Sequence, residues 1–98
     1  MYRSIGMPEF YQKTKRQSLA IIDIRETHEY RFGHVPQAVN FPLSELGSAY
    51  GKLDTDKEYY IICQSGSRST MACNFLAAKG YRVVNVMGGT SAWLGGLE

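Results

Sequence analysis

The residues with the clearest chemical potential lie in the segment Cys63 to Ser69, CQSGSRS. A cysteine ends an apolar run there, and small polar residues follow it. Residues as small as Ser65, Gly66 and Ser67 let successive backbone N–H groups turn toward one point, and a helix that follows adds unpaired amides and the positive end of its dipole. Such a cradle favours anions and lowers the pKa of a cysteine below its ordinary value. The segment therefore predicts a nucleophilic thiolate at Cys63.

A second cysteine offers the structural alternative. A lone cysteine after an apolar run is most often a small core residue, and only the loop of glycine and serine that follows Cys63 favours function there. Cys73 lies in a helical pattern beside Ala72 and Phe75, with no glycine turn next to it. We expect Cys73 to be structural. The two cysteines do not form a Cys-x-x-Cys pair, and a reducing compartment would keep both as thiols.

Apolar runs that alternate with helical patterns predict the strands and helices that position the loop after Cys63. The runs are Leu19 to Ile24, Ala38 to Phe41, Tyr59 to Cys63 and Arg82 to Val86. Continuous apolar strands of this kind predict an α/β domain whose mostly parallel sheet is covered by helices on both faces. Helices are expected from Pro8 toward Arg16, over the segment LSELGSAYGKL, and from about Arg68 to a stop at Lys79-Gly80. Because Cys63 ends a strand, it belongs at the carboxyl edge of the sheet, where open α/β folds bind ligands.

Composition limits the remaining classes of function. The chain of 98 residues, 44% of them hydrophobic, suits one domain spanning residues 1–98. Its net charge is +2, and the basic residues are scattered apart from Lys13 to Arg16, which we interpret as a solvated helix end. No apolar run is long enough for a membrane span or a secretory signal. We therefore expect a cytoplasmic protein that binds neither nucleic acid nor membrane.

Three segments, in order along the chain, resemble one family. The loop from Cys63 to Ser69 is similar to the active-site loop Cys-x-x-Gly-x-Arg-Ser/Thr of single-domain rhodanese-type sulfurtransferases. Ile21 to Leu46 resembles the family's upstream signature, in which an Asp-x-Arg precedes a Glu and then a Gly-His-x-Pro-Gly-Ala-x-Asn-x-Pro segment. VVNVMGGTSAW, near the C-terminus, resembles its last strand, followed by Gly-Gly and a helix that bears a Trp. Gln37 departs from the pattern, because the family usually has glycine at that turn.

The resemblance implies a rhodanese-like three-layer α/β domain with a central parallel five-stranded sheet flanked by helices. It implies that a sulfane sulfur moves from a small anionic donor such as thiosulfate to a thiol or cyanide acceptor, through a persulfide on Cys63. A sulfur-accepting protein is a further possible partner, and no metal or organic cofactor is needed. The loop that would hold the persulfide charge with its amides comprises Gln64, Ser65, Gly66, Ser67, Arg68 and Ser69. The neutral loop lacks the extra cations that would suit a larger anionic donor.

Four upstream residues are expected to support the loop: Asp23, Arg25, Glu29 and His34. We interpret Asp23 and Arg25 mainly as an ion pair or loop anchor. Glu29 could pair with Arg25 if that stretch is helical, which would contribute only ~0.2–0.5 kcal/mol. His34 is expected to form a hydrogen bond or fix a turn rather than act as a general base, since a thiolate has no proton to remove.

The sequence leaves the role of Arg68 open and indicates a packing role for Trp93. Arg68 could orient a sulfonate-like donor through paired N–H groups, or it could form an ion pair with a carboxylate at the helix start, and the sequence favours neither. Trp93 is expected to pack in the core rather than form a substrate wall.

Two other functional classes compete with sulfur transfer. Cysteine phosphatases use a similar amide cradle, but their loop has five residues between cysteine and arginine, whereas here position 69 is Ser69 and the arginine comes one residue sooner. A shorter cradle suits a single sulfur better than a tetrahedral phosphate. A persulfide carrier or interaction module that serves a protein partner is the other alternative, and a carrier would use the same residues.

Overall fold

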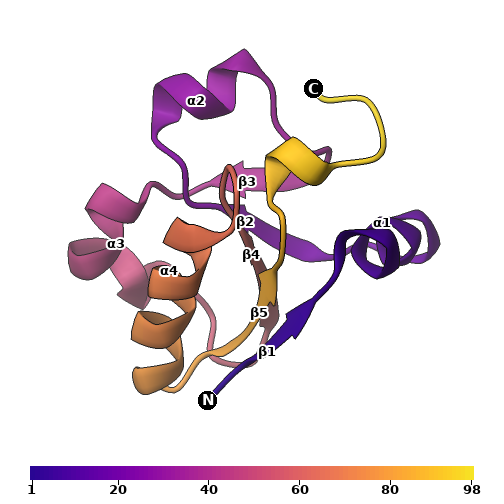
Figure 1. The fold of residues 1–98 in the computed structure, drawn as a ribbon. Helices are drawn as coiled ribbons and strands as arrows, with labels where there is room; N and C mark the ends of the chain where they lie inside the picture. Colours follow the sequence, from indigo (N-terminus) through magenta and orange to yellow (C-terminus); the bar gives the residue numbers. More distant parts are fainter.

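A sheet of five parallel strands forms the centre of the computed structural model, which describes residues 1–98 (Figure 1). The strands are β1 (Arg3–Ile5), β2 (Ala20–Asp23), β3 (Ala38–Asn40), β4 (Glu58–Ile62) and β5 (Arg82–Val86). Their order across the sheet is β1-β5-β4-β2-β3, and every neighbouring pair is parallel. The predicted α/β class with a parallel five-stranded sheet is confirmed.

Helices cover both faces of this sheet. They are α1 (Met7–Arg16), α2 (Thr27–Phe32), α3 (Leu43–Ala49) and α4 (Ser67–Ala78), with 3-10 turns η1 (Tyr50–Lys52) and η2 (Thr90–Ala92). Figure 1 shows α1 on one side of the sheet and α3 with α4 on the other, while α2 lies beyond the edge where the strands end. None of the helices is long and apolar enough to cross a membrane.

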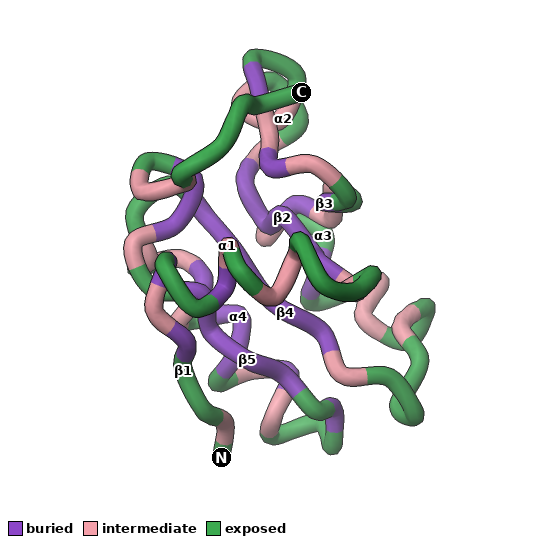
Figure 2. Tube along the Cα trace, turned by 90° about the vertical axis from the view of Figure 1, so that its right-hand side faces the viewer, coloured by how far each residue is buried: buried purple, intermediate pink, exposed green.

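Two apolar clusters hold these layers together. Adjacent strand residues point to opposite faces, so Ile21 joins the cluster under α1 and Ile22 joins the cluster under α3 and α4. The three central strands β2, β4 and β5 are buried along most of their length, as Figure 2 shows for β4 and β5. Burying a side chain the size of Ile or Leu contributes about 1.5–3 kcal/mol, so the two clusters are the main source of stability.

The structure corrects several boundaries predicted from the sequence. Strand β1 was not among the expected apolar runs, because it is only three residues long and only Ile5 is buried. Helix α2 has no buried residue, so no apolar stripe marked it. Trp93 follows the 3-10 turn η2 rather than lying on a helix. Helix α1 does end in the basic run Lys13 to Arg16, which confirms that run as a helix end.

The turn at Gln37 keeps a shape that favours glycine. Gln37 has φ 76, in the left-handed region that costs most side chains energy. Its side-chain amide offsets part of that cost, because Oε1 accepts a hydrogen bond from the Leu19 amide at 3.2 Å and Nε2 donates to the Thr14 carbonyl at 3.5 Å. The departure from glycine therefore leaves the left-handed turn in place.

Candidate active site

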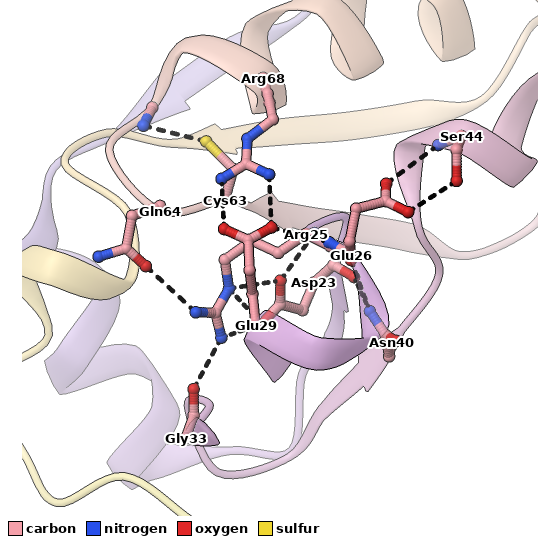
Figure 3. Close-up of polar contacts among 11 residues, drawn as sticks. Asp23, Arg25, Glu26, Glu29, Gly33, Asn40, Ser44, Cys63, Gln64 and Arg68 are labelled. Atoms are coloured by element: carbon pink, nitrogen blue, oxygen red, sulfur yellow. Dashed lines mark hydrogen bonds and ion pairs between the residues drawn. The ribbon is translucent and has the colours of Figure 1, made fainter. Parts of the chain in front are cut away.

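Cys63 is the first residue after β4, at the carboxyl edge of the sheet, and it has no exposed surface. Its Sγ accepts a hydrogen bond from the Gly66 amide at 3.0 Å, the dashed line that ends on the sulfur in Figure 3. The Sγ also lies 3.5 Å from the Ser69 Oγ. Helix α4 begins at Ser67, one residue earlier than expected. The predicted cradle thus exists around the sulfur, with Gly66 as its nearest amide.

Glycines at two positions give the loop its shape. Gly66 has φ 114 and precedes α4, and its carbonyl accepts hydrogen bonds from the Ser69 and Thr70 hydroxyls. Gly89 has φ 62, and a Cβ there would lie 2.4 Å from the Cys63 carbonyl oxygen. That close approach lets the Thr90 amide donate to the same carbonyl at 2.8 Å. The turn after β5 therefore fixes the backbone under the cysteine.

The environment of Cys63 stabilises a thiolate. Burial alone raises the pKa of the thiol, but hydrogen bonds from the Ser69 hydroxyl and from the amides of Ser69, Gly66 and Ser65 outweigh it and lower the pKa below the ordinary value of 9.0. These groups stabilise only the charged form, as cradle amides do for any anion. Cys63 is therefore more readily ionised than an ordinary cysteine.

A buried ion pair braces the loop from below. Asp23, fully buried, accepts hydrogen bonds from Nε and Nη2 of Arg25, the shortest at 2.8 Å. Arg25 also donates to the Gly33 carbonyl at 2.8 Å and to the Gln64 Oε1 at 3.1 Å. The expected ion pair is confirmed, and it links β2, the end of α2 and the loop.

A second ion pair joins α2 to α4 and corrects the expected partner of Glu29. Both carboxylate oxygens of Glu29 accept from Arg68, at 2.7 and 2.9 Å (Figure 3). The expected pairing of Glu29 with Arg25 is wrong, because Arg25 precedes the first residue of α2 and its side chain turns back to Asp23. Of the two roles left open for Arg68, the structure displays the ion pair.

Comparisons with known proteins agree with this geometry. The family model for the rhodanese-like domain matches residues 7–95. The chain belongs to this family. It is 43% identical over 79 residues to the putative sulfurtransferase YtwF of Bacillus subtilis (strain 168), covering 81% of this chain and 77% of that relative. A rhodanese-like domain protein from Staphylococcus aureus has a solved structure with TM-score 0.91 and 33% identity, covering 98% of this chain and 96% of that one.

A further relative differs in length. The chain is 40% identical over 96 residues to the putative sulfur carrier protein YrkF of the same Bacillus, covering 96% of this chain but only 52% of that relative. The chain thus spans about half of a protein that is named a carrier. The names of these relatives connect the rhodanese-like domain with sulfur transfer in general.

His34 of this rhodanese-like domain has its hydrogen bonds away from the thiol. Its Nδ1 donates to the Tyr30 carbonyl at 3.0 Å, and its ring stacks on that of Tyr30 with centroids 3.7 Å apart. Its backbone exchanges hydrogen bonds with Glu98 at 3.1 and 2.9 Å. These contacts favour the turn-fixing role expected for His34.

The cradle also uses a residue that sequence reasoning missed. Asn85 of β5 is buried, and its Oδ1 accepts a hydrogen bond of 2.6 Å from the Ser69 hydroxyl. That hydroxyl has one hydrogen but faces three acceptors: Asn85, the Gly66 carbonyl and Cys63. The only available signal was a polar residue inside the apolar run RVVNV.

A cavity of about 400 Å³ lies beside the loop of the rhodanese-like domain. Its walls include Arg25, Gln64, Thr90 and Trp93. Trp93 packs against Phe10 as expected, with ring centroids 6.0 Å apart, but it is only half-buried and also lines the cavity, which was not expected. The remaining loop residues Gln64, Ser65 and Ser67 are exposed. This part of the loop is therefore open to solvent at the carboxyl edge of the sheet.

Proposed function

We propose that this rhodanese-like domain transfers sulfane sulfur through a persulfide on Cys63. The observation that carries the proposal is the 3.0 Å hydrogen bond from the Gly66 amide to the Cys63 Sγ, in a loop whose donors lower the pKa of that thiol. A persulfide is an anion with no proton to share, so its charge needs preorganised donors of this kind. The loop from Gln64 to Ser69 is their source, with the Asp23–Arg25 pair as its brace.

The first half of the cycle loads the sulfur. The Cys63 thiolate attacks the outer sulfur of a donor such as thiosulfate, a new S–S bond forms, and the old S–S bond breaks. Sulfite leaves with the electron pair, so the cysteine carries –S–S⁻ and the total charge is unchanged. The lowered pKa of Cys63 supports this step, because the thiolate is the nucleophilic form.

The second half returns the cysteine to its starting state. An acceptor thiolate, or cyanide, attacks the outer sulfur, and the Cys63 thiolate leaves. Both halves are displacements at sulfur, and neither needs a metal or an organic cofactor. We propose that residues 1–98 act as a single domain in the cytoplasm, where a reducing environment would keep Cys63 as a thiol.

A persulfide carrier is the second candidate. The relative named a putative sulfur carrier aligns with nearly all of this chain, which favours a function in which the acceptor is a protein. The same persulfide on Cys63 would serve both roles. The two differ only in whether small thiols discharge the sulfur efficiently.

Intact mass of the protein after incubation with thiosulfate tests the proposal. The wild type and Cys73→Ser should each gain one sulfur atom that a reductant removes, whereas Cys63→Ser should gain none. Sulfur on all three, or sulfur on none of them with thiosulfate and with an organic persulfide alike, would contradict a persulfide at Cys63. If the persulfide forms but small thiols and cyanide fail to discharge it, the carrier function is favoured over the enzyme.

A further inference from the structure

Two arginines lie at the cradle, and each is engaged by a carboxylate. Arg25 binds Asp23 in a pair whose side chains are 5% and 0% exposed. Arg68 binds Glu29 in a pair whose side chains are 33% and 27% exposed. The formal charges of these four side chains cancel. An incoming anion therefore finds the cradle amides, but no uncompensated cation among the charged side chains around them.

Glu29 is held in place independently of Arg68. Its Oε1 also accepts a hydrogen bond of 3.0 Å from the Glu26 amide, in the first turn of α2. The helix dipole stabilises a carboxylate at this end of α2. Hydrogen bonding to Arg68, partly opposed by burial and aided by the Glu26 amide, lowers the pKa of Glu29 to about 2. The carboxylate is thus a fixed charge at neutral pH.

The pair lies beside the reactive sulfur. Figure 3 shows the Arg68 guanidinium against the Glu29 carboxylate, with the Cys63 sulfur beside it in this view. Hydrogen bonding to Glu29 is the main cause that raises the pKa of Arg68, burial opposes it, and the charges of Glu29, Cys63 and Asp23 add to the rise. The charge of Cys63 therefore acts on Arg68, both of whose Nη atoms donate hydrogen bonds to Glu29.

Donors of sulfane sulfur differ in charge. Thiosulfate is a dianion, whereas an organic persulfide carries one negative charge on its S–S⁻ group. A dianion would need a free guanidinium in addition to the amides, or would have to displace Glu29 from Arg68. A bidentate arginine–carboxylate pair is among the stronger charge-assisted contacts, so that displacement is unfavourable.

We propose that Glu29 is a specificity-determining residue, which withholds Arg68 from anionic donors and makes the site prefer singly charged persulfides to thiosulfate. The inference rests on the proposed persulfide chemistry at Cys63. In the reaction it favours, the Cys63 thiolate attacks the outer sulfur of the donor persulfide, the donor S–S bond breaks, and the donor thiolate leaves. No other reactant is required.

Single-turnover loading of Cys63, followed by intact mass, tests the inference with two donors. One is thiosulfate, and the other is the persulfide of mercaptoethanol, whose only charge is on sulfur. Glu29→Gln keeps an oxygen that can accept from the Glu26 amide but removes the charge that holds Arg68. The expected result is a loading rate with thiosulfate about tenfold higher than in the wild type, equivalent to about 1.4 kcal/mol, and a change of less than about twofold with the persulfide.

Two control variants isolate the cause. Glu9→Gln removes a charge from an exposed position in α1 and should change neither rate. In the double variant Glu29→Gln with Arg68→Gln, the gain with thiosulfate should vanish, because the freed guanidinium is its source. Glu29→Ala, also expected to favour thiosulfate selectively, serves as a second variant if the glutamine variant folds poorly.

Three outcomes would count against the proposals and can be told apart. An unchanged or lower thiosulfate rate in folded Glu29→Gln and Glu29→Ala would overturn the role of Glu29. An equal rise with both donors would overturn it too, because charge selection predicts a rise with thiosulfate alone. If neither donor loads Cys63 in the wild type, the proposed function itself fails, and the inference fails with it.

Discussion

The two cysteines of this chain share a core cluster but have opposite chemistry. Cys63 and Cys73 both have no exposed surface, and both contact the apolar cluster under α4. The pKa of Cys63 is lowered, whereas burial, with a smaller contribution from the charge of Cys63, raises the pKa of Cys73 to about 12. Burial by itself disfavours the thiolate at both positions.

The difference comes from hydrogen-bond donors. Cys63 lies just before the start of α4, where the Gly66 amide and the Ser69 hydroxyl are available to its sulfur. Cys73 lies inside α4, where the backbone amides are used by the helix itself. A buried cysteine in this fold is therefore reactive only where unpaired donors reach it.

The largest expected effect is on the steady-state rate of sulfur transfer when either cysteine is replaced by serine. Cys63→Ser should lower steady-state sulfur transfer by roughly 1,000-fold or more, because the serine hydroxyl is not ionised at neutral pH and cannot hold a persulfide. Cys73→Ser should leave turnover within about twofold of the wild type. A comparable loss in both variants would erase the distinction between the two cysteines.

The next effect concerns the turn that supports Cys63. A Cβ at Gly89 would lie 2.4 Å from the Cys63 carbonyl oxygen and 2.6 Å from that of Gln64, both backbone atoms. Gly89→Ala should therefore lower the free energy of unfolding by about 3 kcal/mol and the melting temperature by about 15 °C. The matched control is Gly47→Ala, since nothing lies within 4 Å of its Cβ position. Equal melting temperatures in the two variants would show that the turn does not fix the loop.

A smaller effect should follow from removing the side-chain donor. Ser69→Ala deletes the hydroxyl that lowers the pKa of Cys63, so the pH midpoint of persulfide formation should move upward. The rate of loading at neutral pH should fall about tenfold, as expected for a hydrogen bond to a charged group. Ser18→Ala, at an exposed position outside the loop, should have little effect. An unmoved midpoint in Ser69→Ala would assign the thiolate to the backbone amides alone.

The last prediction concerns stability at alkaline pH. Because the pKa of Cys73 is about 12 in the folded chain against an ordinary 9.0, the unfolded chain loses this proton first as pH rises. Stability is therefore lost above pH 9, by up to about 1.4 kcal/mol per pH unit for one proton. Urea unfolding of the wild type and Cys73→Ala at several pH values measures this slope. Equal slopes for the two proteins would contradict a buried neutral thiol at Cys73.

Local pattern was enough to locate the cysteine loop and most of the sheet. The apolar run before Cys63 predicted β4, and the small residues after it predicted a donor loop that leads into α4. The five-stranded parallel arrangement followed from the resemblance, because β1 is too short to be recognised by its own pattern. Helix α2 was not predicted, since it lies at the edge of the sheet without a buried face.

Contacts between distant residues could not be predicted in this way. Glu29 and Arg68 are 39 positions apart, and only the docking of α2 beside the start of α4 brings their side chains together. Asn85 meets Ser69 because β5 is the sheet neighbour of β4. Such partners depend on tertiary structure, so spacing along the chain favoured the nearer but wrong pair of Glu29 with Arg25.

Carbon NMR of protein labelled at the cysteine β-carbons would test the contrast between the two cysteines most directly. The shift of each β-carbon reports the ionisation of its own thiol, and Cys63→Ser and Cys73→Ser assign the two signals. We predict that Cys63 titrates below the ordinary value of 9.0, while Cys73 titrates near 12 or only as the protein unfolds. If the two signals titrate together, or Cys63 titrates above Cys73, the loop does not stabilise a thiolate and the proposed chemistry is contradicted.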